Sequence, residues 1–166
     1  MSIFDFILIL IVFGFVWYGF WFGFIRRIGG LLGVAMGALL ASRFYPLLAP
    51  QITFLLGGSV LVSQIVSFIL LYIIFNRLTA FAFGLIDKVF GVFTKLPGLK
   101  TINRFIGAFL GLVEGSLTIG LLLFFVAKLG VGGLLAKSQV APHLINVAKV
   151  LLPLLPKALK GLQTVI

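Results

Sequence analysis

Residues 3–27, IFDFILILIVFGFVWYGFWFGFIRR, decide the fold class of this chain. A helix that crosses the hydrocarbon core of a bilayer needs about 20 mostly apolar residues. The run 3–25 reaches that length and contains one charged side chain, Asp5. Its far end carries the aromatic belt and cationic pair that are typical of a membrane interface: Trp17, Tyr18, Trp21, Arg26 and Arg27. The stretch therefore predicts a transmembrane helix, and with it an integral membrane protein.

The composition of the whole chain supports the same class. Of its 166 residues, 62% are hydrophobic and 10% are charged, and the mean hydropathy is +1.32. A soluble domain has about 45–50% apolar and about 25% charged residues, so a water-soluble globule and a disordered chain are both excluded. The net charge of +10 comes from basic residues at the ends of apolar runs. We therefore expect a bilayer with anionic headgroups as the partner, and no nucleic acid.

Three further apolar runs are long enough to cross a membrane, and they predict helices over 28–45, 57–76 and 105–127. Pro46 and Pro50 predict a break and a short turn after the second of these helices. The fold class predicted is all-α, a polytopic membrane bundle of about four transmembrane helices. Residues 1–128 form the membrane domain.

Two segments have the pattern of amphipathic helices lying in the membrane interface. In 78–96, lysines and glycines fall on one face and phenylalanines on the other. A straight continuation of the third span into this segment would exceed the bilayer thickness, so a bend is expected near Asn76 and Arg77. The tail, 129–166, places Asn146, Lys149, Lys157 and Lys160 on one face, which Pro153 and Pro156 interrupt. It predicts a kinked interfacial helix.

Small residues recur every four positions in two of the predicted spans. The second span carries Gly29, Gly33, Gly37 and Ala41, and the last span carries Gly107, Gly111 and Gly115. Such a stripe lets another backbone approach closely, so we interpret both as helix-packing surfaces. A gating or substrate-lined surface is the alternative for the first stripe. The partner of each stripe, in the same chain or in a second copy, stays open. Ser59, Ser63, Ser67 and Gln64 are interpreted as polar contacts between helices, with a solute path as the alternative.

The two acids in the predicted spans receive different interpretations. Asp5 lies at one end of the first span, and we expect a solvated boundary residue. Glu114 lies near the middle of the last span, where an ionisable group is costly and is by default a functional hypothesis. Two interpretations of Glu114 stay open: a proton or cation relay, or a protonated side chain hydrogen-bonded to serines or to Gln64.

The sequence shows no pattern of catalytic or metal-binding residues. Cysteine is absent and His143 is the one histidine, so neither a disulfide nor a thiolate metal site is expected. We see no nucleophile-base pair, and Gly107-x-x-x-Gly111 has no preceding strand that would make it a nucleotide fingerprint. We expect no enzyme, no metal and no cofactor.

The distribution of charge also predicts an orientation. Asp5 precedes the first span and Arg26 and Arg27 follow it. The first helix usually dominates the positive-inside rule, so both termini are predicted to lie outside the cytoplasm.

Three stretches, taken together, resemble the colicin V production protein family of bacterial inner-membrane proteins. The first is Asp5 followed by 22–26, FGFIR, and by the small-residue helix that ends in 41–45, ASRFY. The second is 103–107, NRFIG, which continues to Gly111 and Gly115. The third is 137–139, KSQ, with Pro142. The residues that match the family-like motif are Asp5, Gly23, Arg26, Asn103, Arg104, Gly107, Gly111 and Gly115.

The chain departs from the family pattern at four positions. The family usually has Arg where Phe22 stands, an acid where Arg27 stands, Asp where Asn103 stands and often a base where Glu114 stands. The resemblance implies a multi-pass bacterial inner-membrane protein associated with toxin (colicin V) production or export. From it and the residues we expect a non-enzymatic accessory or scaffold protein that contacts other membrane proteins or a second copy of itself. The alternative is a small channel or transporter subunit that uses Glu114 as an ion or proton site.

Overall fold

The computed structural model describes residues 2–54, 57–90, 99–129, 135 and 137–155, apart from the side chains of 25 and 86–90. In these residues the chain forms three long helices, α1 (Ile3–Thr53), α2 (Val60–Phe90) and α3 (Leu99–Lys128). The short helix α5 (Val140–Ala148) and the 3-10 helix η1 (Lys149–Leu154) follow. No strand occurs in the part of the chain described. The prediction of an all-α membrane bundle is confirmed.

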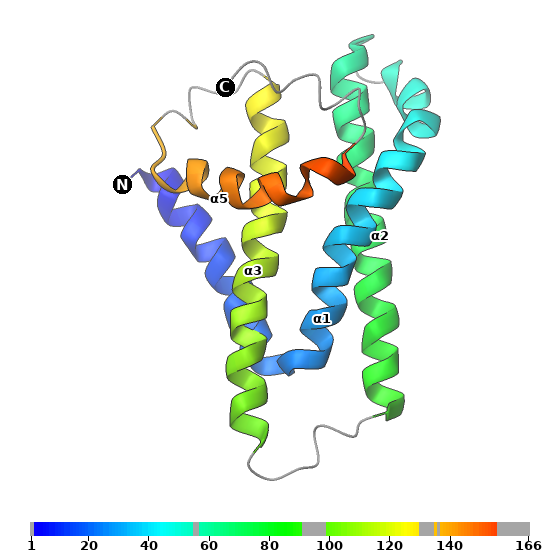
Figure 1. Cartoon of the computed structure of the whole chain (residues 1–166). Coiled ribbons are helices and arrows are strands. Elements are labelled where there is room, and N and C mark those ends of the chain that lie inside the picture. The colour runs from blue at the N-terminus through cyan, green and yellow to red at the C-terminus, as the bar shows by residue number, and fades with distance from the viewer. Residues whose placement is uncertain (1, 55–56, 91–98, 130–134, 136, 156–166) are drawn as a thin grey trace.

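Helix α1 is folded into two legs that meet at a sharp corner (Figure 1). The corner is Gly23, whose φ of 75° and ψ of −171° lie outside the helical region. A positive φ of this kind is strained for a residue with a Cβ and readily adopted by glycine. The two legs, Ile3–Phe24 and Arg26–Thr53, are each long and apolar enough to span a membrane. With Val60–Leu85 and Thr101–Lys128 they make the four spans that the sequence predicts.

The second leg does not break at its prolines, so the prediction of a turn at Pro46 and Pro50 is wrong. Both prolines lie inside α1, which continues to Thr53. A proline removes one backbone donor, but neighbouring helices and hydroxyl side chains can compensate in a membrane protein. Tyr45 and Ala49 are both 6% exposed, and the Ser42 hydroxyl of the same leg donates to the carbonyl of Leu154 in η1 at 2.7 Å. Tertiary packing therefore holds this segment in the helical conformation.

Helix α2 is continuous from Val60 to Phe90, so the bend predicted near Asn76 and Arg77 is absent. The reason is the second leg of α1, which packs along α2 on both sides of that point. A Cβ built on Gly37 would meet the carbonyl of Tyr72 at 3.1 Å, and one on Gly29 would meet the side chain of Phe83 at 2.4 Å. Residues 91–96 of the predicted interfacial helix lie outside the described residues.

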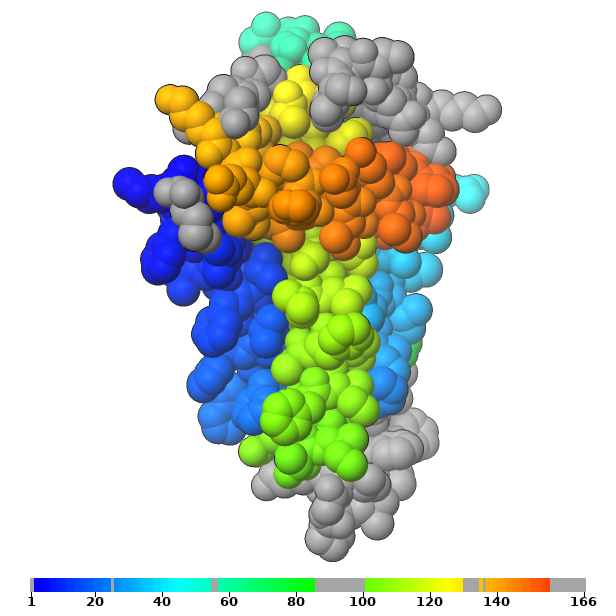
Figure 2. All heavy atoms as spheres, turned by 60° about the vertical axis from the view of Figure 1, so that its left-hand side comes forward, coloured from blue at the N-terminus to red at the C-terminus, as the bar shows by residue number. Residues whose placement is uncertain are grey.

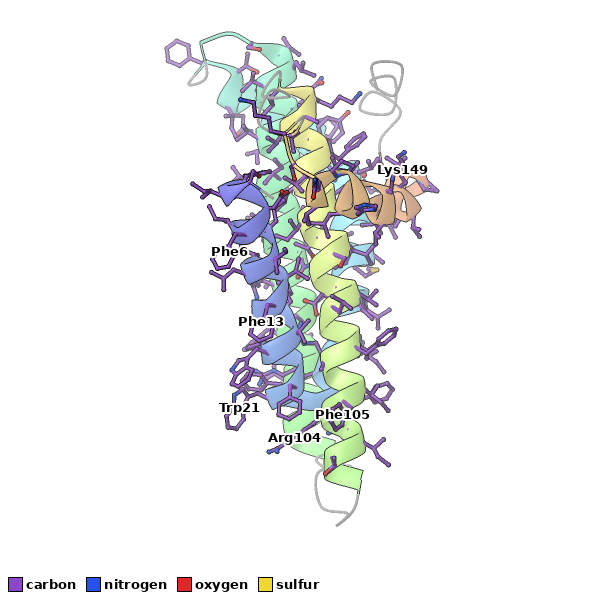
Figure 3. All side chains as sticks on the ribbon, turned by 90° about the vertical axis from the view of Figure 1, so that its left-hand side faces the viewer. Phe6, Phe13, Trp21, Arg104, Phe105 and Lys149 are labelled. Carbon is purple, nitrogen blue, oxygen red and sulfur yellow. The ribbon has the colours of Figure 1, made fainter. Side chains whose placement is uncertain are left out.

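Helix α5 and η1 lie across α3 like a strap (Figure 2). A Cβ on Gly120 of α3 would lie 2.0 Å from the carbonyl of Leu144, so glycine permits this crossing. The strap closes a core between α2, α3 and the second leg, in which Ile65, Phe68 and Phe125 are fully buried. Of the predicted tail, 137–155 is described, and residues from Pro156 onward lie outside the described part. Large apolar side chains such as Phe6, Phe13 and Trp21 cover the outside of the first leg (Figure 3).

Candidate functional site

A buried ion pair joins Arg27 and Glu114 inside the bundle. The Nη1 atom of Arg27 lies 2.5 Å from Oε2 of Glu114, and the side chains are 3% and 11% exposed. The Nη2 atom of Arg27 donates to the backbone carbonyl of Phe15 at 2.8 Å. One guanidinium thus joins both legs of α1 to α3. Removing one partner of such a buried pair leaves an uncompensated charge, which is far more costly than replacing both.

The corner of α1 and two glycines make room for this pair. Arg27 follows Gly23 closely, so its side chain is directed back along the first leg, and its guanidinium lies 4.7 Å from the ring centre of Tyr18. A Cβ on Gly30 would lie 2.3 Å from Oε2 of Glu114, and a Cβ on Gly19 would lie 3.1 Å from Nε of Arg27. Side chains at these two positions would therefore displace the pair.

Both sequence interpretations of Glu114 left out its actual partner. The hydrogen bond of Glu114 in the described structure goes to Arg27 and not to a serine or Gln64. The Ser63 hydroxyl bonds to the Ser59 carbonyl instead, and the buried Ser67 hydroxyl has no partner among the described residues. Arg27 itself was interpreted as a surface anchor. One signal in the sequence did point to Arg27. The family resemblance implies an acid at position 27 and often a base at position 114, and this chain has a base and an acid there.

Beside the ion pair lies a hollow of about 600 Å³, which we call the arginine hollow. Its walls come from both legs of α1, from α2 between residues 73 and 81, and from Glu114 of α3. Its charged lining residues are Arg26, Arg27, Arg77 and Glu114. A second hollow of about 380 Å³ shares Tyr18, Arg27, Arg77 and Glu114 with it. Three guanidiniums against one carboxylate give the arginine hollow an excess of positive charge.

Asp5 is fully buried, so the prediction of a solvated boundary residue is wrong. Its Oδ2 accepts from the backbone N–H of Ser2 at 2.9 Å, completing a capping box at the start of α1. Its Oδ1 accepts from the Ser138 hydroxyl and from the backbone N–H groups of Gln139 at 3.1 Å and Val140 at 3.2 Å. A carboxylate accepts on both oxygens, so Asp5 connects the start of α1 to the start of α5.

The Asn103 side chain supports the corner of α1 from α3. Its Oδ1 accepts from the backbone N–H of Phe24 at 2.9 Å, a group that the break at Gly23 leaves without its helical partner. A Cβ on Gly23 would collide with Asn103 at 2.4 Å. Next to it, the Arg104 guanidinium lies 5.9 Å from the ring centre of Trp21, and Figure 3 shows both at the same end of the bundle. Arg26 lies 4.3 Å from the ring centre of Phe22.

The glycine stripes lie against two different partners in the same chain. Gly107, Gly111 and Gly115 face the first leg of α1: a Cβ on Gly107 would lie 2.3 Å from the carbonyl of Gly19, and one on Gly111 would lie 2.4 Å from the carbonyl of Phe15. Gly29, Gly33 and Gly37 face α2, and Ala41 is fully buried in the core. The stripes thus position the two legs that hold Arg27.

The arrangement can hold charge but offers few groups for chemistry. In the described residues, no group of three or more His, Cys, Asp or Glu side chains could hold a metal ion. Glu114 is paired, Asp5 is enclosed by donors, and the two lie on different parts of the bundle. The polar contacts described therefore link helices to one another and leave the arginine hollow and its smaller neighbour beside them.

Comparison with known proteins places these features in a family. The sequence model described as Colicin V production protein matches residues 4–149, a range that includes Asp5, Arg27, Asn103, Glu114 and Ser138. A curated protein of Haemophilus influenzae, "Colicin V production protein homolog", is 30% identical over 104 residues. The match covers 63% of this chain and 60% of the relative. This chain therefore matches less than two thirds of the length of that relative. No solved structure matches the chain.

Proposed function

This chain belongs to the colicin V production protein family, and on that basis we propose that it is a non-enzymatic accessory or scaffold protein of the bacterial inner membrane. In this role it supports the production or export of a toxin of the colicin V type. It acts through contacts between helices and with other membrane proteins or a second copy of the chain. Family membership supports a multi-pass, toxin-production-related membrane protein, and the remaining points are our inference.

The observation that carries the scaffold role is the engagement of Glu114 by Arg27. A relay acid must exchange its proton or ion, whereas Glu114 lies 2.5 Å from a guanidinium that is 3% exposed. That guanidinium also bonds to the carbonyl of Phe15. The pair therefore works as a bracket that fixes the two legs of α1 against α3.

An orientation with both termini outside the cytoplasm is part of the proposal. The start of α1 and the start of α5 lie at one end of the bundle, because Asp5 bonds to Ser138. The corner of α1 lies toward the opposite end (Figure 1), with Arg26 and Arg104 close to it. The basic residue directly after the first span favours a cytoplasmic location for the corner, because the first helix usually dominates the positive-inside rule. Arg27 is not counted as an interfacial charge because it is paired inside the bundle.

A small channel or transporter subunit is the second candidate, and the hollows favour it. Glu114 and Arg77 line the hollows of about 600 Å³ and about 380 Å³. An intramembrane acid beside such a hollow is the usual arrangement of a site for ions or protons. This candidate requires the carboxyl of Glu114 itself, whereas the scaffold role requires only that the side chains at positions 27 and 114 pair without leaving a net charge, as two glutamine amides can.

This difference defines the experiment. Colicin V export, divided by the membrane abundance of the protein, is measured in a producer strain that lacks its own family member. The variants are Glu114→Gln, the neutral double variant Arg27→Gln/Glu114→Gln, and Gly111→Leu. The scaffold role predicts that the double variant exports normally and that Gly111→Leu does not. Loss of export by a double variant of normal abundance would replace the scaffold role with the transport role.

A further inference from the structure

The arginine hollow is lined by three arginines, and one of them, Arg27, is in an ion pair within the described residues. Arg27 is engaged by Glu114, but Arg77 is exposed and makes no hydrogen bond or ion pair within the described residues. Arg26 contacts the ring of Phe22 and has no acid partner there. A guanidinium in a membrane span is costly unless it pairs with an anion or reaches an interface. Among the side chains that the structure describes, these two guanidiniums thus line one hollow without a carboxylate partner of their own.

The rim of the hollow is apolar and exposed. Ile73, Ile74, Leu78 and Phe81 of α2 line it, and their side chains are between 45% and 66% exposed. These residues continue along the α2 helix on both sides of Arg77. A ligand that fits must therefore combine a negative head with long apolar chains. The volume, about 600 Å³, falls in the range of about 300–1,000 Å³ that is usual for small-ligand sites.

The position in the bundle indicates where such a ligand enters. The corner of α1 stops short of the ends of α2 and α3 that lie on its side of the bundle (Figure 1). Arg26 is at that corner, and Arg77 lies eight residues before the end of the span Val60–Leu85. A lipid of the leaflet on this side can therefore reach both guanidiniums from the side while its chains stay among the other lipids. Basic recesses between transmembrane helices bind anionic headgroups in this way.

We propose that the arginine hollow is a binding site for one anionic phospholipid. Its phosphate lies between Arg26 and Arg77, and its acyl chains lie along Ile73 and Ile74, which precede Arg77 on the side of the bilayer centre. The planar guanidinium of Arg77 forms the two parallel hydrogen bonds to phosphate that an ammonium cannot form. The Arg27–Glu114 pair forms the inner wall and is not part of the contact. The site is independent of the role in toxin production, so either proposal can fail alone.

The test uses the full-length protein, purified in a neutral detergent and titrated with dioleoyl phosphatidylglycerol or dioleoyl phosphatidylcholine. Bound lipid is counted by native mass spectrometry, and the melting temperature is followed in parallel. We expect one tightly retained phosphatidylglycerol and a rise in the melting temperature that phosphatidylcholine does not give. Arg77→Gln should weaken this binding about tenfold or more, because it removes a charge-assisted pair. The affinity of Arg77→Lys for phosphatidylglycerol should lie between those of the wild type and Arg77→Gln. Lysine keeps the positive charge but cannot form the two parallel hydrogen bonds of a guanidinium.

Two controls separate this site from other sources of binding. Lys149→Gln removes one exposed positive charge on the strap (Figure 3), at a residue that does not line the hollow, and should bind phosphatidylglycerol like the wild type. Inorganic phosphate and glycerol 3-phosphate at millimolar concentration should neither compete nor stabilise. Equal retention of phosphatidylglycerol and phosphatidylcholine would overturn the proposal. So would an equal loss of phosphatidylglycerol binding in Lys149→Gln and Arg77→Gln, or displacement of the bound lipid by a soluble phosphate.

Discussion

Asp5 and Ser138 lie 133 positions apart in the sequence, yet the Ser138 hydroxyl donates a hydrogen bond to the Asp5 carboxylate. The contact joins the first and the third stretch of the family-like motif. It fixes the strap formed by α5 and η1 at the end where α1 begins. The same carboxylate accepts from the backbone N–H groups of Gln139 and Val140, so it also caps the start of α5. Through these contacts the Asp5 carboxylate connects the strap to the start of α1.

Replacing this acid should release the strap. In Asp5→Ala the donors of Ser138, Gln139 and Val140 lose their acceptor, and buried donors without a partner are destabilising. We expect faster cleavage of the chain before α5 by a protease added to detergent-solubilised protein. Ser2→Ala is the matched control, because it removes the other half of the capping box and leaves the contact with Ser138 in place. Equal protection of the strap in Asp5→Ala and the wild type would show that the strap does not need this carboxylate.

The glycines of α3 allow a prediction with an internal control. Gly111→Ala places a Cβ 2.4 Å from the carbonyl of Phe15, whereas a Cβ on Gly14 meets nothing within 4 Å. Overpacking of this kind costs about 1–3 kcal/mol, while alanine in an open helical position gains about 0.5–1 kcal/mol over glycine. The free energy of unfolding in detergent should therefore fall in Gly111→Ala and rise or stay unchanged in Gly14→Ala. Similar values for the two would mean that α3 and the first leg do not approach closely.

Asn103 should tolerate an acid but not an apolar side chain. Asn103→Asp keeps the oxygen that accepts from the N–H of Phe24 at 2.9 Å, and Asp is the residue that the family resemblance implies at this position. Asn103→Leu leaves that N–H without a partner at the corner, at a cost of about 1 kcal/mol. Thermal unfolding should rank the wild type and Asn103→Asp together, above Asn103→Leu. A Leu variant as stable as the wild type would remove Asn103 from the support of the corner.

The spans could be predicted from the sequence because their cause is local. Burial in lipid requires about 20 apolar residues in succession, and Trp21 with Arg26 marks the end of the first run. The predicted turn at Pro46 and Pro50 was wrong because the loss of two backbone donors is a local effect. In the folded chain the packing around Tyr45 and Ala49 outweighs it. The continuity of α2 past Asn76 has the same origin, since the glycine stripe of the second leg supports it.

The polar contacts could not be predicted from spacing. Arg27 and Glu114 lie 87 positions apart, and in the sequence Arg27 looks like the second of two interfacial arginines. Its inward direction follows from the corner at Gly23, and a single glycine among 20 gives no local sign of a positive φ. The family resemblance implies an acid at position 27 and often a base at position 114, and the opposite residues found at both positions are the available signal. The two opposite charges can be recognised as an ion pair only when the fold shows that the side chains of Arg27 and Glu114 are in contact.

The central claim is that Glu114 serves to balance Arg27, and a double-mutant cycle of unfolding free energies tests it most directly. The cycle compares Arg27→Gln, Glu114→Gln and the double variant in detergent. Each single variant leaves one buried group unpaired and should lose about 3–5 kcal/mol, whereas the double variant should recover most of that loss. Additive losses, with the double variant less stable than either single variant, would contradict the account.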